Sequence, residues 1–382
     1  MSVSTLLRRA GVAASIAAAC AAAHAHAHGD EAAAAARLPQ RTELLARAQA
    51  ELERGDAAQA LDDFERAAMM LHAADAELGL IRAAMQDGQY RRALAFCAHT
   101  AGEHTDDADG GALYAWLLRI GGQGELAAQV LADTRAHVPD DAVAAAVARA
   151  FAATPPIASG VLLQPPHRMA PWPVVIDSRS SPPQTARFVS NGVLVDDGSA
   201  ALVPLPLLDG AAGMRLWVRN GLGQVSEAKL AHGGGDLASR GLARLELRWP
   251  LPVGASLQAT GRAPFAGSPG FSLQFGDGSG PAWPMLTQGF LGTLVGDTGV
   301  RKLGFASPPG AAVLDARGML IGVTLASTGG PATWLPVPST APSQAASAPT
   351  PPAHAGPALT APDEIYETGL RRALQVLAAP PP

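Results

Sequence analysis

Few residues of this chain have a type and spacing that could do chemistry. His24, His26 and His28 alternate near the N-terminus, and their imidazoles could bind a metal ion if all three remain on the chain. Ser307 could act as a nucleophile if a histidine base lay beside it. His232, followed by three glycines, is the only histidine between residues 173 and 338. No Gly-x-Ser-x-Gly elbow, phosphate-binding glycine loop or zinc-finger spacing accompanies these residues, so we expect no metal and no cofactor.

Length and composition limit the elements that could position such residues. The chain has 382 residues, of which 48% are hydrophobic and 5% aromatic, which is enough for two or three compact units. Its formal net charge is −5, so nothing favours binding to nucleic acid or to an anionic membrane surface.

Residues 1–27 are predicted to be a signal peptide. Arg8 and Arg9 precede a short apolar run, and Ala-x-Ala cleavage motifs follow near residue 25. The run is too short to span a bilayer, so we expect no transmembrane span and a periplasmic or secreted protein. Acylation at Cys20 would make it a lipoprotein instead, and that alternative stays open. The second cysteine, Cys97, is expected to be a core residue.

Residues 41–153 are predicted to form an array of helical repeats. Their apolar residues have helical spacing, and three kinds of position recur after 33 and then 34 residues. These are a glycine at 55, 88 and 122, an alanine at 60, 93 and 127, and a larger apolar residue at 64, 97 and 131. The stretch Gly88–Ala93, with its Gly-x-Tyr-x-x-Ala pattern, resembles the tetratricopeptide (TPR) repeat family. A helical bundle without true repeats is the alternative.

The TPR resemblance implies a concave groove that binds protein or peptide. On that register the first helix of each hairpin would present to the groove five residues, namely Gln49, Arg82, Met85, Trp116 and Arg119. Arginine beside tryptophan suits an extended peptide or a carboxylate. The alternative is that Trp116 belongs to the core and that the arginines are merely solvated.

The rest of the chain is predicted to be a β-domain between two linkers, followed by a helix. Prolines mark residues 154–172 as a linker or an extended arm, in which His167 is expected to be exposed. Residues 173–338 alternate short apolar runs with glycine turns, which predicts a β-barrel or sandwich. The predicted strands are 174–176, 188–195, 216–218, 243–247, 272–275, 312–314 and 320–325. Residues 339–362 are a Pro/Ala/Ser linker, and 363–378 are predicted to be an amphipathic helix whose apolar face needs a partner surface.

The β-domain resembles the trypsin-like serine peptidases over three stretches. Residues 191–211 are similar to a strand, a turn and the strand that carries the catalytic histidine. Residues 242–247 are similar to the strand after the catalytic aspartate. Residues 309–323 are similar to the nucleophile loop and the hairpin that follows it. The resemblance implies a double β-barrel, so the fold class is α+β and multidomain: a TPR-like all-α array, an all-β trypsin-like double barrel and a C-terminal helix.

The same resemblance implies that the catalytic residues are missing. The histidine falls at Leu205 or Pro206, the aspartate at Gly241 and the nucleophile at Pro309, which also lacks a backbone N–H for an oxyanion. We therefore expect no catalytic residue and an exported, non-catalytic protein-binding adaptor of unknown oligomeric state. Two alternatives remain: an active serine endopeptidase with a displaced triad that uses Ser307, and an assembly role in which the C-terminal helix docks on a partner.

Overall fold

The computed structural model describes seven parts of the chain. They are residues 31–153, 162–167, 181–231, 235–253, 264–326, 331–337 and 360–381. The predicted signal peptide, the first predicted strand (174–176), His232 and most of the linker 339–362 lie outside these residues. No described helix has both the length and the apolar character that crossing a membrane requires.

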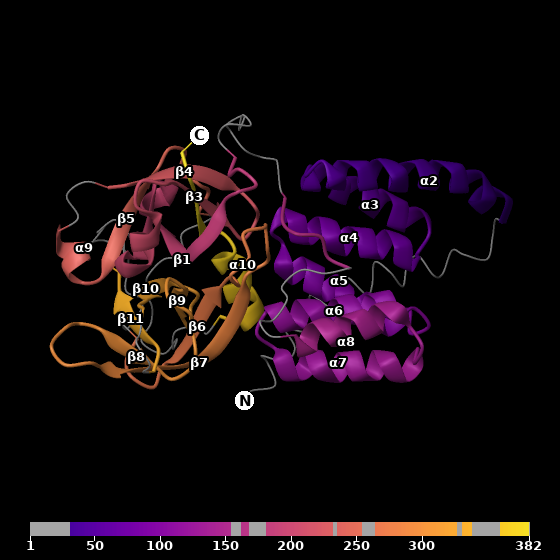
Figure 1. Ribbon diagram of the computed structural model, residues 1–382. Coiled ribbons are helices and arrows are strands. Elements are labelled where there is room, and N and C mark those ends of the chain that lie inside the picture. The colour runs from indigo at the N-terminus through magenta and orange to yellow at the C-terminus, as the bar shows by residue number, and fades with distance from the viewer. Residues whose placement is uncertain are drawn as a thin grey trace, which may run out of the picture.

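The N-terminal part is a stack of seven helices in which each helix packs on the next along the chain (Figure 1). The helices are α2 (Glu31–Glu53), α3 (Ala57–Met70), α4 (Ala74–Asp87), α5 (Tyr90–Glu103), α6 (Ala108–Ile120), α7 (Gly124–His137) and α8 (Ala142–Ala152). Short connections force neighbouring helices to pack against each other as hairpins. The predicted helical array is therefore confirmed.

The recurring residues occupy equivalent places in this stack. The three glycines, at 55, 88 and 122, all have a left-handed backbone with φ of 80°, 78° and 81°. Such a φ ends one helix and turns the chain into the next, and glycine adopts it without steric cost. The three alanines have no exposed surface, and Phe64, Cys97 and Leu131 are buried behind them. The repeat read from the sequence is thus a repeat in structure.

The remaining chain forms two closed antiparallel barrels of six strands each. The first barrel has the order β1-β12-β3-β4-β5-β2 and the second β10-β11-β8-β7-β6-β9. The first contains β1 (Arg187–Val195), β2 (Ala200–Pro204), β3 (Arg215–Asn220), β4 (Val225–Leu230), β5 (Leu242–Leu247) and β12 (Ala373–Ala379). The second contains β6 (Pro269–Gln274), β7 (Met285–Leu294), β8 (Arg301–Leu303), β9 (Ala312–Asp315), β10 (Leu320–Thr324) and β11 (Thr333–Pro336). A helical array followed by two barrels is the predicted fold class.

The C-terminal segment corrects one prediction. A helix was expected over 363–378. Instead, α10 spans only Pro362–Gly369, and residues 373–379 form the strand β12. This strand pairs antiparallel with β1 on one side and β3 on the other. All seven of its residues are buried, so its apolar residues follow no alternation that would distinguish a strand from a helix.

The array and the barrels are packed directly on each other, with α10 between them (Figure 1). The rings of Tyr90 in α5 and Tyr366 in α10 are both fully buried, with centroids 4.4 Å apart. Tyr366 donates a hydrogen bond to the carbonyl of Pro284 in the second barrel (2.8 Å). Glu367 accepts from the backbone N–H of Arg91 in α5 (2.8 Å). The apolar face of α10 is therefore covered within this chain.

Candidate functional site

The residues to which the resemblance assigns a catalytic histidine (Leu205 or Pro206) and a catalytic aspartate (Gly241) lie side by side. Leu205 begins a short 3-10 helix (Leu205–Ala211) that follows β2, and Gly241 directly precedes β5. The backbone N–H of Leu205 donates to the carbonyl of Gly241 (2.9 Å). The fold thus brings Leu205 and Gly241 together, and neither side chain offers a group that can transfer a proton.

The loop at the nucleophile position is closed by its own hydrogen bonds. Pro309 has no backbone N–H, and the next two N–H groups both donate to Thr324: Gly310 to its carbonyl (2.9 Å) and Ala311 to its Oγ1 (2.8 Å). The Thr324 hydroxyl in turn donates to the carbonyl of Pro308 (2.5 Å). The donors at 310 and 311 are therefore committed to β10 and do not face a reacting carbonyl.

Gly310 also connects the two barrels. Its φ is +83°, and a Cβ there would lie 2.0 Å from the backbone oxygen of Asn191 in β1. Asn191 is buried, accepts a hydrogen bond from the N–H of Phe275 (2.7 Å) and donates to the Phe275 carbonyl (3.4 Å). The two barrels therefore pack tightly on each other at this loop.

Ser307 has polar partners, but none of them is a base. Its Oγ lies 2.6 Å from Ser272 Oγ and 3.4 Å from Gln274 Oε1. Within the described residues, no imidazole or carboxylate is hydrogen-bonded to this hydroxyl. A hydroxyl bonded to another hydroxyl and an amide is not activated for attack.

The five residues predicted to line a peptide groove do not form one surface. Met85 and Trp116 are buried in the core of the array, with 0% and 2% of their surface exposed. Arg119 donates to the carbonyl of Phe151 (2.9 Å), and its guanidinium lies over the Phe151 ring. Burial lowers the pKa of Arg119. These three residues therefore serve the packing of α4, α6 and α8.

Gln49 and Arg82 line a small cavity of about 120 Å³ that part of the chain itself covers. Its other wall is formed by Leu162–Gln164. These residues begin the segment Leu162–His167, which we call the cis segment because it belongs to the same chain as the array. Arg82 Nε donates to the carbonyl of Leu162 (2.9 Å), and burial lowers the pKa of this guanidinium. The Gln49 side chain donates to Glu53 Oε1 within α2 (2.9 Å).

Gln86 holds the cis segment as a peptide ligand would be held. Its Nε2 donates to the carbonyl of Pro165 (3.1 Å), and its Oε1 accepts from the N–H of His167 (3.0 Å). The His167 ring bonds the carbonyl of Leu52 in α2 (2.7 Å), so this histidine is half-buried rather than exposed as expected. From the barrel side, Trp283 donates to the carbonyl of Gln164 (3.0 Å). An extended segment with two prolines is therefore bound between the array and the second barrel.

Two features of the site are absent from the sequence analysis. Gln86 was not predicted, because its role depends on hydrogen bonds to a segment about 80 residues further along the chain. A cluster of His72, Glu77 and His99, the only group of potential metal ligands found in the described residues, was overlooked because its members belong to different helices and match no motif.

Comparison with known proteins gives limited information. No protein-family model and no curated protein matches this sequence. One solved structure that matches is the apo form of the MamO protease domain from Magnetospirillum magneticum. It has 16% sequence identity and a TM-score of 0.32, over 41% of this chain and 87% of that domain. A match of this quality carries no argument about function, and the double-barrel assignment rests on the strand order.

Proposed function

We propose that this protein is an exported, non-catalytic adaptor, in which a TPR-like helical array binds protein or peptide and a trypsin-like double barrel acts as an inactive module. The proposal is carried by the residues to which the trypsin-like resemblance assigns the catalytic positions: Leu205 or Pro206, Gly241 and Pro309. The backbone hydrogen bond between Leu205 and Gly241 supports this assignment, because it holds the first two positions together.

The binding half of the proposal is supported by the cis segment. The face of the array that includes Gln49, Arg82 and Gln86 accommodates an extended stretch of this chain through backbone hydrogen bonds. Carbonyl and N–H groups of any extended peptide offer the same partners, so this face suits a segment from another protein when the cis segment is displaced.

The export half of the proposal is supported by the sequence alone. A positive n-region, an apolar run and Ala-x-Ala motifs within residues 1–27 are typical of a signal peptide.

The serine-endopeptidase alternative requires Ser307 to gain a base. The contacts of its hydroxyl, to Ser272 and Gln274, offer none. The assembly alternative requires a free apolar face on the C-terminal helix, whereas Ile365, Tyr366 and Leu370 are fully buried within this chain.

A peptide-binding experiment tests the adaptor function. Residues 162–167 are replaced by a Gly/Ser stretch of equal length, and a fluorescent synthetic peptide with the sequence of Leu162–His167 is titrated into this variant. We expect saturable binding to the variant and much weaker binding to the wild-type chain, whose own segment competes at high effective concentration.

Two further substitutions in the Gly/Ser variant control this experiment. Gln86→Ala removes the amide that bonds the segment and should weaken binding about 10-fold, since two neutral hydrogen bonds contribute roughly 1–2 kcal/mol. Gln129→Ala, at an exposed position on α7, should leave the affinity unchanged. Absence of binding to the Gly/Ser variant, or equal loss in both substitutions, contradicts a peptide-binding role for this face.

A further inference from the structure

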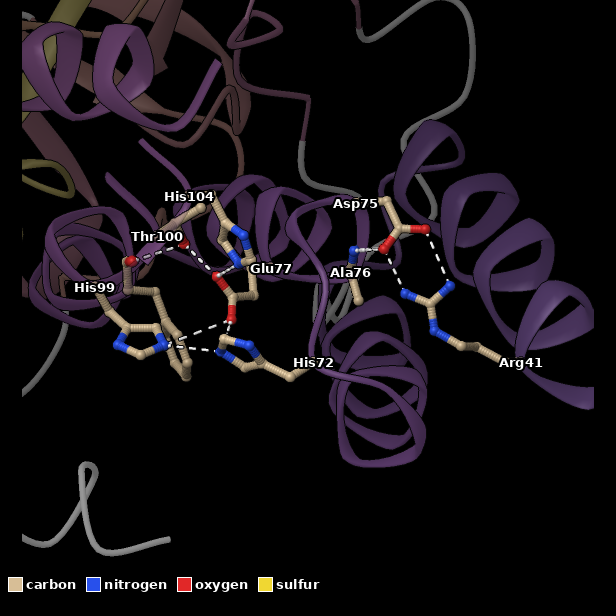
Figure 2. Close-up of polar contacts among 9 residues, drawn as sticks. Arg41, His72, Asp75, Ala76, Glu77, His99, Thr100 and His104 are labelled. Atoms are coloured by element: carbon tan, nitrogen blue, oxygen red, sulfur yellow. Dashed lines mark hydrogen bonds and ion pairs between the residues drawn. The ribbon is translucent and has the colours of Figure 1, made fainter. Parts of the chain in front are cut away.

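Three side chains of the helical array converge at one point (Figure 2). His72 lies in the connection between α3 and α4, Glu77 in the first turn of α4 and His99 near the end of α5. One potential ligand atom from each lies within 4.8 Å of the others. The carboxylate of Glu77 has only 4% of its side chain exposed, while the His72 and His99 side chains are 29% and 24% exposed. The cluster therefore joins a buried anion to imidazoles that solvent can reach.

The distances between these atoms suit a single small cation. His72 Nε2 lies 2.7 Å from Glu77 Oε1 and 3.0 Å from His99 Nε2, and His99 Nε2 lies 3.6 Å from the same carboxylate oxygen. Ligands about 2.0–2.1 Å from a tetrahedral zinc ion are about 3.3 Å from each other. The three separations fall on both sides of that value, so small side-chain adjustments would bring all three atoms into coordination.

A cation also satisfies these atoms better than protons do. Two ring nitrogens and one carboxylate oxygen face one another, and a proton on His72 Nε2 would be shared between the oxygen and the second ring nitrogen. A metal ion at the centre accepts a lone pair from each of the three at once.

The surroundings of Glu77 hold it in the orientation that a metal ligand needs. The buried hydroxyl of Thr100 donates to Glu77 Oε2 (2.7 Å), which leaves Oε1 directed at the imidazoles. His104 stacks on the His72 ring, with centroids 5.3 Å apart, and its Nε2 lies 3.5 Å from Glu77 Oε2. This buried nitrogen makes no hydrogen bond to the described residues. A hydrogen bond such as that from Thr100 orients a ligand of a protein metal site.

We propose that this protein binds one Zn²⁺ ion through His72 Nε2, Glu77 Oε1 and His99 Nε2, with water in the fourth position. Two imidazoles and a carboxylate favour zinc over Ca²⁺ or Mg²⁺, which prefer oxygen ligands only. The ion ties the α3–α4 connection to α5 and so fixes the spacing of two successive repeats.

Zinc titration of the purified full-length chain tests the site. The chain first carries alanine at His24, His26 and His28, so that the N-terminal histidines cannot contribute. In this background we expect one zinc per chain by calorimetry and a rise in the unfolding temperature with added Zn²⁺, because a ligand of the folded state stabilises it. Substituting either partly exposed ligand, as His72→Ala or His99→Ala, should weaken binding about 100-fold or more. Thr100→Val, which removes the hydroxyl that positions Glu77, should weaken it about 10-fold.

His137→Ala is the matched control, because His137 is an exposed histidine on α7 that bonds a backbone carbonyl. It should leave zinc affinity unchanged. Zinc-edge X-ray absorption should show two imidazoles and oxygen ligands in the bound ion. Loss of all zinc in the triple-alanine background, or equal affinity of the His99→Ala and His137→Ala variants when both are folded by circular dichroism, overturns the proposal.

Discussion

The two barrels have the same number of strands, but they are built from the chain in different ways. All six strands of the second barrel come from one continuous stretch, 269–336. Five strands of the first barrel come from 187–247, and the sixth, β12, comes from 373–379 at the far end of the chain. The second barrel is thus an insertion within the first. Pairing between residues so distant in sequence requires a long loop to close, which costs conformational entropy.

This difference means that the last residues determine the closure of the first barrel. Without β12, the strands β1 and β3 would present unpaired edges to solvent. Leu374 and Val376 fill the first barrel's main core, and Leu377 packs with Trp217 in a second cluster. The second barrel needs nothing from this segment for its own strand pairing.

Removing residues 370–382 should have the largest effect. We expect the first barrel to open while the second keeps its strand pairing, because only the first loses a central strand. Limited proteolysis with mass spectrometry measures this as rapid cleavage within 187–247 and protection within 269–326. Removing only residues 380–382, which lie beyond β12, is the control and should change little. Continued protection of 187–247 in the longer deletion would show that β12 is not needed for closure.

The predicted strands that the structure describes are divided equally between the two barrels. The runs at 188–195, 216–218 and 243–247 overlap strands of the first barrel, and those at 272–275, 312–314 and 320–325 overlap strands of the second. No run was predicted for β4, β7, β8 or β11. The strand β12 was predicted as helix, because Leu370, Leu374 and Leu377 have helical spacing and burial on both faces removes the alternation of a strand.

The residues of the two candidate sites, the catalytic positions of the barrels and the groove of the array, were also predicted to different extents. Leu205 and Gly241 lie together, but their assignment to catalytic positions follows from the family resemblance and stays a prediction. The groove residues were predicted from the 3.6-residue period, which leaves open how each helix is rotated in the stack, and Met85 and Trp116 face the core. Whether the groove binds a partner stays a prediction.

Gly310→Ala should have the second-largest effect, because it disturbs the contact between the barrels. A methyl group would overlap the Asn191 carbonyl, and φ of +83° is unfavourable for alanine. We expect a loss of about 2–4 kcal/mol in the free energy of unfolding, measured with urea. Gly299→Ala is the matched control: its φ is +73°, but no atom lies within 4 Å of the added Cβ, so only the backbone cost of about 1–2 kcal/mol should appear. Equal losses would mean that the barrels do not press together at Gly310.

Alkaline pH should have a smaller effect, acting on the helix that leads into β12. Burial raises the pKa of Tyr90 and of Tyr366 well above the usual value of about 10. The unfolded chain releases these protons near pH 10 while the folded chain keeps them, so stability is full below that pH and declines as pH rises further. We expect the urea midpoint to fall between pH 9 and pH 11.

Tyr366→Phe provides the comparison for this decline. It removes one of the two buried phenols, together with the hydrogen bond to Pro284, so the variant should be less stable at pH 9 and should lose less stability on going to pH 11. An identical decline in variant and wild type would show that Tyr366 does not resist ionisation.

The central claim, that the double barrel is inactive as a peptidase, is tested most directly by a fluorophosphonate probe and intact-protein mass measurement. The wild-type chain and its Ser307→Ala variant are incubated with the probe beside an active serine peptidase. We predict no added mass on either chain. Among the described residues, no basic side chain is hydrogen-bonded to the Ser307 hydroxyl, and Pro309 has neither a nucleophilic side chain nor a backbone N–H. Covalent labelling of the wild-type chain that disappears in Ser307→Ala would contradict the account.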